Sequence, residues 1–377
     1  MESGCHWKVG AGRLTPDAWQ AARGLDVSGL EKVFELNRQG FDPARGLVAL
    51  GLLFVPFAVA SALDIEAYYL SMAFGAAFIA MSDPGGTFGY RLPRVLLVAV
   101  SGALLTALAF GLGDGGWGLI VASVFALTLL GGLAVTFGVH RFMALYLLAI
   151  WYLIALTLPA AYAIDGTSNH PWAQAAAWLG GSALWIGFSA LVWLARGREP
   201  QPQPIPEIPG DVTRRRLTQQ IVLFALLRAF AVSLTVAITF GLDLPKASWM
   251  PIATIVAMKP SLDQAQLYAA QRLAGAILGA VLAAVVLLTI TNKHALELLI
   301  VGLAAVAGAV RAVNYALYTA AVAALVLIAE DVPHPQNLTE EWDRIAYTFI
   351  GVGIAVAVML IASRLQARSA PSPSPAT

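Results

Sequence analysis

The sequence has little charge and almost no cysteine. Only 12% of its 377 residues are Asp, Glu, Lys or Arg, whereas a soluble globular domain carries about 25%. Cys5 is the single cysteine, which excludes an intramolecular disulfide framework. The formal net charge of +1 gives no electrostatic basis for a nucleic-acid partner. Hydrophobic residues make up 59% of the chain, which points to a membrane protein instead.

Motifs of the common hydrolases are also missing. The chain has no His-Glu-x-x-His, no Gly-x-Ser-x-Gly and no pair of carboxylates in an apolar context. Every Asp and Glu lies in a tail, a loop or the end of an apolar segment. A central carboxylate of the kind that carries protons or Na⁺ in many transporters is therefore missing as well. We predict neither an enzyme nor a metal or cofactor site.

Long apolar segments follow one another along most of the chain. A transmembrane helix needs roughly 17–25 apolar residues, so the sequence predicts an all-α polytopic membrane protein with about 12 spans. The segment 248–259 is too short to cross a bilayer unless its polar ends are buried. The expected spans are 47–63, 67–82, 94–112, 116–137, 142–163, 173–195, 221–242, 248–259, 271–290, 295–311, 313–329 and 344–363.

Basic residues fall on alternate loops of this arrangement. With the N-terminus inside, 19 of the 23 Lys and Arg residues lie in inner tails and loops, 3 lie in outer loops, and Arg228 lies within a span. Cytoplasmic loops are enriched in Lys and Arg, so we predict that both termini are cytoplasmic. Arginine outnumbers lysine, which indicates a bacterial source and hence the inner (plasma) membrane.

A linker rich in proline and glutamine divides the spans into two equal sets. Residues 196–216 are too short for a domain and are expected to form a semi-extended cytoplasmic tether. The predicted units are an N-terminal tail (1–46), a first six-helix bundle (47–195), the linker (196–216), a second six-helix bundle (217–365) and a disordered tail (366–377). Because six is even, both bundles enter the membrane from the same side and form a parallel repeat.

Two short strings in the two halves resemble each other. The first is Ala80-Met81-Ser82-Asp83-Pro84-Gly85, and the second is Ala257-Met258-Lys259-Pro260-Ser261. Each follows a short apolar segment, and matched interrupted segments in two halves are a sequence pointer to a transport site. The alternative is an ordinary helix stop and turn. The candidate pathway residues at these breaks are Asp83, Pro84, Gly85, Pro260 and Ser261.

Three basic residues of the second half are candidates for attracting an anion. Arg228 lies inside an apolar run, Lys259 ends the short segment, and Arg272 opens the next one. A basic inner vestibule would attract organic anions, and arginine binds carboxylates through two hydrogen bonds. The alternative is that these side chains reach the membrane interface and only set the topology.

Other conspicuous residues admit simpler interpretations. Trp249 and Pro251 would suit an aromatic substrate and a helix break, or an interfacial tryptophan and a proline in a first helical turn. The spacing Gly275-(x)3-Gly279 predicts close contact between helices. His140 is expected to be solvated on an inner loop.

The second half resembles the fusaric acid resistance protein-like (FUSC) family. The resemblance lies in Leu227-Arg228, Trp249-x-Pro251, Lys259-Pro260-Ser261-Leu262 and Arg272-(x)2-Gly275, and the first half is similar around Tyr68-Tyr69 and Ser82–Gly86. It implies an inner-membrane exporter of aromatic carboxylic acids. This chain has only a short linker where longer relatives carry a cytoplasmic domain.

Three classes of function remain open from the sequence. The first is a secondary exporter of organic anions, with a small anion and the lipid bilayer as partners and a periplasmic adaptor or a homo-oligomer as candidate protein partners. The second is an uncoupled anion channel, which the missing central carboxylate favours. The third is a membrane scaffold without transport, for which the paired breaks would serve no purpose.

Overall fold

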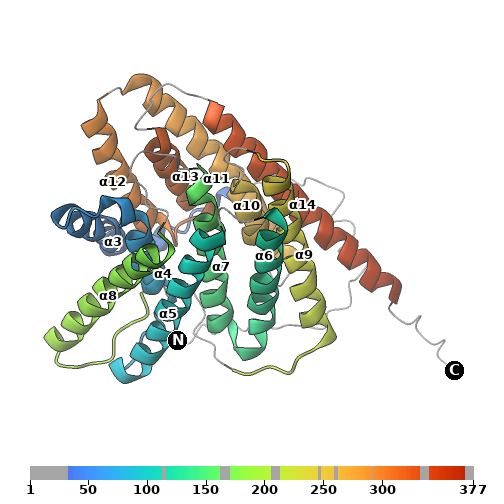
Figure 1. Cartoon of the computed structure of the whole chain (residues 1–377), viewed down its shortest axis with the longest axis horizontal. Coiled ribbons are helices and arrows are strands. Elements are labelled where there is room, and N and C mark those ends of the chain that lie inside the picture. The colour runs from blue at the N-terminus through green and yellow to red at the C-terminus, as the bar shows by residue number, and fades with distance from the viewer. Residues whose placement is uncertain are drawn as a thin grey trace.

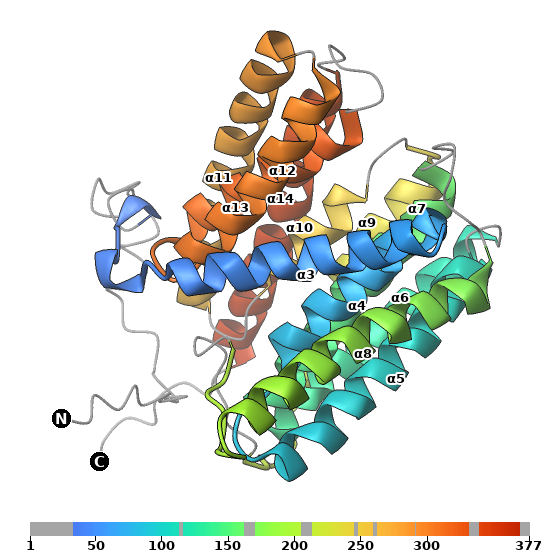
Figure 2. The same ribbon diagram turned by 90° about the vertical axis from the view of Figure 1, so that its left-hand side faces the viewer.

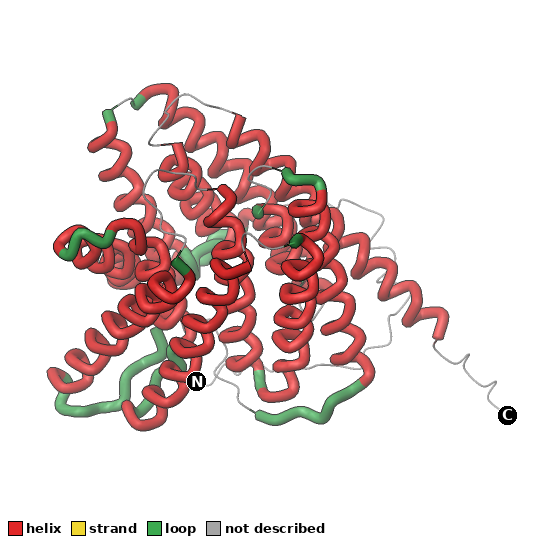
Figure 3. Tube along the Cα trace, viewed as in Figure 1, coloured by secondary structure: helices red, strands yellow, loops and turns green. Residues whose placement is uncertain are grey.

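The computed structural model describes residues 33–112, 116–161, 170–204, 213–244, 248–258, 262–290, 292–331 and 339–369. These residues form twelve α-helices (Figures 1 and 3). The first six are α3 (Pro43–Ala62), α4 (Tyr69–Ser82), α5 (Phe88–Leu112), α6 (Trp117–Leu133), α7 (Val139–Ala161) and α8 (Pro171–Ala195). The other six are α9 (Gln219–Gly241), α10 (Trp249–Ala257), α11 (Leu262–Thr289), α12 (Lys293–Val310), α13 (Tyr315–Asp331) and α14 (Thr339–Ser369).

Each of the twelve apolar segments lies on one of these helices. Seven of the helices are long and apolar enough to cross a membrane, and three further apolar stretches, in α12, α13 and α14, are shorter. The two that remain, α4 with 14 residues and α10 with 9, are the short segments of the sequence. The chain is therefore an all-helical, multi-pass membrane protein.

The helix boundaries follow local sequence signals. Asp42 caps α3, since its carboxylate accepts hydrogen bonds from the backbone N–H of Ala44 (3.0 Å) and Arg45 (3.3 Å). Thr218 caps α9 and Asn292 caps α12 in the same manner. Sequence reasoning placed the start of α5 at residue 94, but the helix begins at Phe88, so that the buried Arg91 lies in its first turn.

Many interior positions hold small residues, and many large apolar side chains point outward. Fully buried positions include many alanines, whereas Leu97, Leu191 and Leu298 are 69%, 67% and 73% exposed. A soluble protein rarely exposes such apolar surface over most of its helices. Lipid covers it at no cost, which fits the membrane assignment.

Helix contacts in the first half recur in the second. Within the halves, α4 packs on α8 as α10 packs on α14, and α5 packs on α7 and α8 as α11 packs on α13 and α14. Between the halves, α6 packs on α9 as α12 packs on α3. Figure 2 shows α3 crossing between one group with α5, α6 and α8 and another with α11, α12 and α13. Each half thus contributes its first helix to the fourth helix of the other.

Glycines mark the contacts between the halves at matched positions. A Cβ on Gly132 of α6 would lie 2.7 Å from Ala225 of α9, and one on Gly308 of α12 would lie 2.6 Å from Ala49 of α3. The interval along the chain from Gly132 to Gly308 equals the interval from Ala49 to Ala225. We call this spacing the repeat interval. The second contact therefore repeats the first with the roles of the two halves exchanged.

A matched pair of glycines also lies inside the halves. Gly181 of α8 abuts the carbonyl of Met72 in α4, and Gly351 of α14 abuts the carbonyl of Met250 in α10. The short helix of each half is thus held against the last helix of that half by the same kind of close approach.

Gly275 and Gly279 confirm the close helix contact that their spacing predicts. A Cβ on Gly275 would lie 2.6 Å from the carbonyl oxygen of Ala316 in α13, and Gly279 touches Ala323 one turn further on. Only glycine permits α11 and α13 to approach this closely.

Loops that the charge pattern assigns to one side of the membrane gather at one end of the molecule. The backbone N–H of Asn37, before α3, donates to the carbonyl of Val313 between α12 and α13 (2.9 Å). The N–H of Arg215, before α9, donates to the carbonyl of Thr136 between α6 and α7 (2.8 Å). The segment before each half's first helix thus binds the same turn of the opposite half.

Candidate functional site

Arg228 lies in the middle of α9 and is 1% exposed. Its Nε and Nη2 atoms have no hydrogen-bond partner among the described residues. A buried guanidinium without partners is costly, because each lost contact with water must be replaced. A side chain buried in the middle of a helix does not extend to the membrane interface, which was the alternative that the sequence left open.

Two aromatic rings of α7 face this guanidinium. The central carbon of the Arg228 guanidinium lies 5.1 Å from the ring centroid of Phe142 and 5.2 Å from that of Tyr146. The two rings stack on each other at 6.2 Å. Such cation–π contacts offset part of the desolvation of the charge. They leave the hydrogen-bonding edge of the guanidinium unsatisfied.

Further cations and aromatic rings of the second half surround Tyr146. Its phenol interacts electrostatically with Arg228, Arg272, Tyr315 and Tyr318. Arg272 of α11 has a buried Nε atom without a hydrogen-bond partner among the described residues. We call this set, together with Arg311, the arginine–aromatic cluster: Phe142, Tyr146, Arg228, Arg272, Arg311, Tyr315 and Tyr318.

An open depression of about 760 Å³ adjoins the cluster. Arg311 and Tyr315 belong to both, and the depression is otherwise lined by residues 35–39, by Leu267 and Gln271 of α11 and by the turn 312–314. Arg311 lies with its guanidinium 5.2 Å from the Tyr318 ring and with Nη1 3.4 Å from the sulfur of Met81. It therefore stands between the depression, the end of α4 and the aromatic rings.

Some residues of the arginine–aromatic cluster have an equivalent of the same kind in the other half, and others do not. Phe142 and Tyr318 are separated by the same repeat interval as the glycines Gly132 and Gly308, and each lies in the first turn of its helix. The residue that lies one repeat interval before Arg228 is Leu52, which carries no charge. The aromatic surround therefore belongs to both halves, whereas the buried cation belongs to the second half alone.

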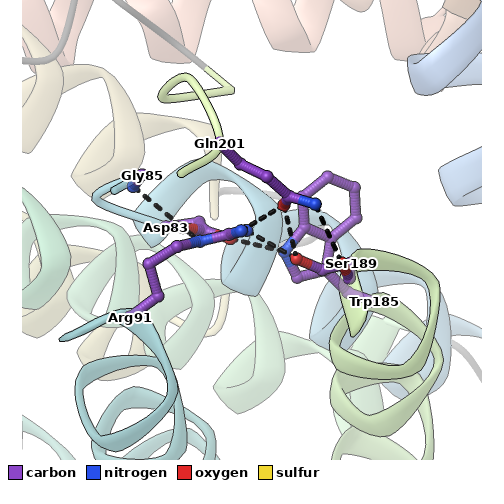
Figure 4. Close-up of polar contacts among 6 residues, drawn as sticks. All are labelled: Asp83, Gly85, Arg91, Trp185, Ser189 and Gln201. Carbon is purple, nitrogen blue, oxygen red and sulfur yellow. Dashed lines mark hydrogen bonds and ion pairs between the residues drawn. The ribbon is translucent and has the colours of Figure 1, made fainter. Parts of the chain in front are cut away.

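A second polar group, the Asp83 cluster, occupies the break after α4. It consists of Asp83, Arg91, Trp185, Ser189 and Gln201 (Figure 4). Asp83 is 2% exposed and pairs with Arg91 through both carboxylate oxygens, the Nε contact measuring 2.8 Å. The Trp185 indole also donates to this carboxylate (3.2 Å), as does the backbone N–H of Gly85 (3.0 Å).

The linker completes the Asp83 cluster. The side-chain oxygen of Gln201 accepts hydrogen bonds from Arg91 and Ser189, and its amide nitrogen donates to the carbonyl of Ser189 (3.1 Å). Its backbone pairs with Gly86 through two hydrogen bonds of 2.7 and 3.0 Å. The start of the linker, which the sequence predicts to be a semi-extended tether, is therefore docked on the protein through Gln201.

These contacts give the first break a structural role. Gly85 has a φ of +69° and its backbone abuts that of Gln203, so the turn around Pro84 needs a residue without a side chain. The pathway role expected for Asp83, Pro84 and Gly85 stays a prediction, and the observed contacts fit a closed turn.

The second break is described only in part. Lys259, Pro260 and Ser261 lie outside the described residues. Pro251 is buried in the first turn of α10, as the simpler interpretation of the sequence expected. Trp249 opens α10 and packs against the large hydrophobic core of the protein. The structure brings Arg228 and Arg272 together around Tyr146 but does not place Trp249 in the arginine–aromatic cluster.

Sequence reasoning missed the aromatic members of the site. Phe142 and Tyr146 are spaced i, i+4, and Tyr315 and Tyr318 are spaced i, i+3, so each pair shares a helix face. The recurrence of an aromatic residue at the repeat interval was a usable signal. Gln201 carried no such signal, because a residue of a polar linker contacts α5 and α8 only through the tertiary fold.

Comparison with known proteins bears on the second half of the chain. Residues 217–358 match the model of the family described as fusaric acid resistance protein-like. The match spans α9 to α13 and most of α14. Searches of the curated proteins and of the solved structures gave no match.

Proposed function

We propose, from the match of residues 217–358 to the fusaric acid resistance protein-like family, that the protein exports organic anions across the inner membrane. Aromatic carboxylates are the substrates that fit the arginine–aromatic cluster best. Their carboxylate would bind the Arg228 guanidinium and their ring would pack among Phe142, Tyr146 and Tyr318. No cofactor takes part, and the chain acts as a transporter and not as an enzyme.

The observation that carries this proposal is the buried Arg228, whose Nε and Nη2 atoms have no hydrogen-bond partner among the described residues. An ionised arginine in a membrane interior is expensive and marks a substrate or ion pathway by default. A carboxylate ligand would satisfy Nε and Nη2 together, because the guanidinium presents two parallel donors. No other described element supplies that partner.

The entrance lies at the open depression beside Arg311. Its residues belong to the end of the molecule where the predicted cytoplasmic loops gather, so substrate would enter from the cytoplasm. Arg311 and Arg272 would raise the local anion concentration, and Arg228 would bind the anion after it loses water. Lys259 would add a positive charge to this vestibule.

The membrane arrangement belongs to the same proposal. Twelve helices would cross or enter the bilayer as two parallel six-helix repeats, with both termini in the cytoplasm. The recurrence of helix contacts and of the glycine pairs supports the repeat. A homo-oligomer and a periplasmic adaptor remain candidate partners of the exporter.

An uncoupled anion channel is the second candidate function. Asp83 is the only fully buried carboxylate among the described side chains, and Arg91 already neutralises it. Among the described side chains, no buried acid is thus left without a basic partner to carry a coupling proton. Flux that responds to membrane potential and ignores a pH gradient would favour the channel.

Flux into proteoliposomes tests the proposal. We expect carrier-mediated flux of benzoate, 4-hydroxybenzoate and benzenesulfonate, with slower flux of acetate and succinate. Arg228→Leu should lower the flux of the aromatic anions at least about tenfold, because a hydrogen bond to a charged group contributes about 1.5–3 kcal/mol. The variant should still fold, since it removes a buried cation and restores the residue type found at Leu52.

Matched variants separate binding from charge. Arg228→Lys keeps the charge without the paired donors and should give intermediate flux. Arg196→Gln removes an exposed cation and should leave flux unchanged. Wild-type flux from a folded Arg228→Leu variant would eliminate Arg228 as a substrate residue, and an absence of flux for every anion would reject transport.

A further inference from the structure

Three consecutive residues at the end of α4 each contact a different polar group. Met81 touches Arg311 at the mouth of the arginine–aromatic cluster, and Asp83 holds the Asp83 cluster together. The carbonyl of Ser82, between them, accepts a hydrogen bond from the imidazole of His140. This one turn of the chain therefore contacts both the His140 imidazole and Arg311 at the mouth of the candidate anion site.

His140 is buried, contrary to the solvated loop position expected from the sequence. It is 5% exposed and lies in the first turn of α7, two positions before Phe142, whose ring covers Arg228. The charged groups that face it are Arg94 of α5, Asp83 at the end of α4 and Arg141 of α7 itself. Arg91 already pairs with Asp83, so these surroundings are positive on balance.

We propose that His140 makes anion binding depend on pH, because its protonation favours the binding of an anion in the neighbouring arginine–aromatic cluster. Histidine is the side chain whose charge ordinarily changes between pH 5 and 8. The inference rests on the proposed transport of organic anions.

The sign of the coupling follows from the charges. The imidazolium adds a cation to a region that already holds Arg94 and Arg141, and this is unfavourable until an anion enters the neighbouring cluster. A bound anion therefore raises the proton affinity of His140. By reciprocity, a bound proton raises the anion affinity by the same factor.

The position of the imidazole at a helix end supports this role. The carbonyl of Ser82 is one of the last in α4, where the helix dipole favours a cation. Protonation would strengthen the contact between α4 and the first turn of α7. That turn holds Phe142 against Arg228, so the proton and the anion act on one structural element.

Calorimetric titration of the purified full-length protein with benzenesulfonate tests the proposal. This probe stays ionised throughout, so any pH dependence belongs to the protein. We expect at least about fivefold tighter binding at pH 5.5 than at pH 8.0, a typical size for coupled sites. Titrations in buffers of different ionisation heat should show proton uptake on binding.

Variants assign the proton to His140. His140→Gln keeps a side-chain donor for Ser82 and should bind the probe with the same affinity at both pH values and without proton uptake. His294→Gln, a change at an exposed histidine, should behave as the wild type. If the Gln variant does not fold, His140→Asn is the second variant. Proton uptake on anion binding is measured with the wild-type protein and so does not depend on either variant.

The outcomes distinguish the two proposals. Binding that is independent of pH, or pH dependence that persists in a folded His140 variant, overturns the role of His140 and leaves anion transport intact. Failure of the wild type to bind benzenesulfonate at either pH, together with absent flux, overturns both.

Discussion

The short helices α4 and α10 occupy equivalent places in the two halves but end in different surroundings. The end of α4 is held by the Asp83 cluster, in which Trp185 and Ser189 of α8 and Gln201 of the linker surround a buried ion pair. The end of α10 packs in an apolar cluster that contains Ala257, Met258 and Val352.

The surroundings of the two helix ends can be compared residue by residue. The glycine contacts align Gly181 with Gly351, and the same shift along the chain aligns Trp185 with Ala355 and Ser189 with Met359. Both equivalents belong to the apolar cluster around α10. A polar network has thus been kept in one copy and replaced by apolar packing in the other.

The two buried arginines, Arg91 and Arg228, also differ in how far their hydrogen-bonding groups are paired. In the first half, Arg91 is fully paired, with Asp83, Ser189 and Gln201 as partners. In the second half, Arg228 lies against aromatic rings, and its Nε and Nη2 have no hydrogen-bond partner among the described residues. A charge whose hydrogen-bonding groups all have partners stabilises one geometry, whereas a charge with unpaired hydrogen-bonding groups can bind a ligand. We infer that the Asp83 cluster is structural and that Arg228 supplies the charge that binds an anion.

Asp83→Ala should have the largest effect on stability among the variants that probe this contrast. It leaves the Arg91 guanidinium buried without its carboxylate, and removal of one partner of a buried pair costs about 3–5 kcal/mol. Thermal unfolding in detergent measures the loss. The exposed Glu66→Gln variant is the control and should unfold as the wild type does.

The double variant Asp83→Ala/Arg91→Met sharpens the interpretation of this ion pair. It should recover much of the lost stability, because no unpaired charge remains. If the Asp83 cluster is structural, the double variant also retains anion flux. Flux lost from a well-folded double variant would instead place Asp83 on the pathway.

Gly181→Ala and Gly351→Ala should each cost about 1–3 kcal/mol through overpacking against the carbonyls of Met72 and Met250. Similar losses in both variants would support equivalent positions in a repeat. Gly187 and Gly353 lie in the same two helices, and a Cβ on either would meet open space. Their alanine variants should be neutral or slightly stabilising, so a comparable loss there would remove the packing explanation.

Asp64→Gly and Asp243→Gly should give the smallest effect. These residues follow α3 and α9 with φ values of 55° and 49°, a conformation that costs energy for any residue with a side chain. Each glycine variant should raise stability by about 0.5–1 kcal/mol in a thermal melt. Unequal signs at the two sites would weaken the equivalence of the halves.

Much of the fold was readable from sequence because its signals are local. Apolar length predicted the position of each helix, and the strings Ala62-Leu63-Asp64 and Gly241-Leu242-Asp243 both end in a left-handed aspartate. The site was readable only in part. Arg228 was a sequence candidate because a charge in an apolar run is conspicuous, but Phe142 and Tyr146 look like ordinary apolar residues of a span.

By itself, the sequence determined that the chain is helical and lies in a membrane. Hydropathy and the distribution of arginine depend on solvation, which each segment expresses without its neighbours. Only the tertiary structure decided which charges are paired. Arg91 binds both Asp83 and Gln201 of the linker, and Arg228 meets α7 instead of a carboxylate, because contacts between distant segments depend on how the helices pack. That difference separates a closed structural turn from a candidate anion site.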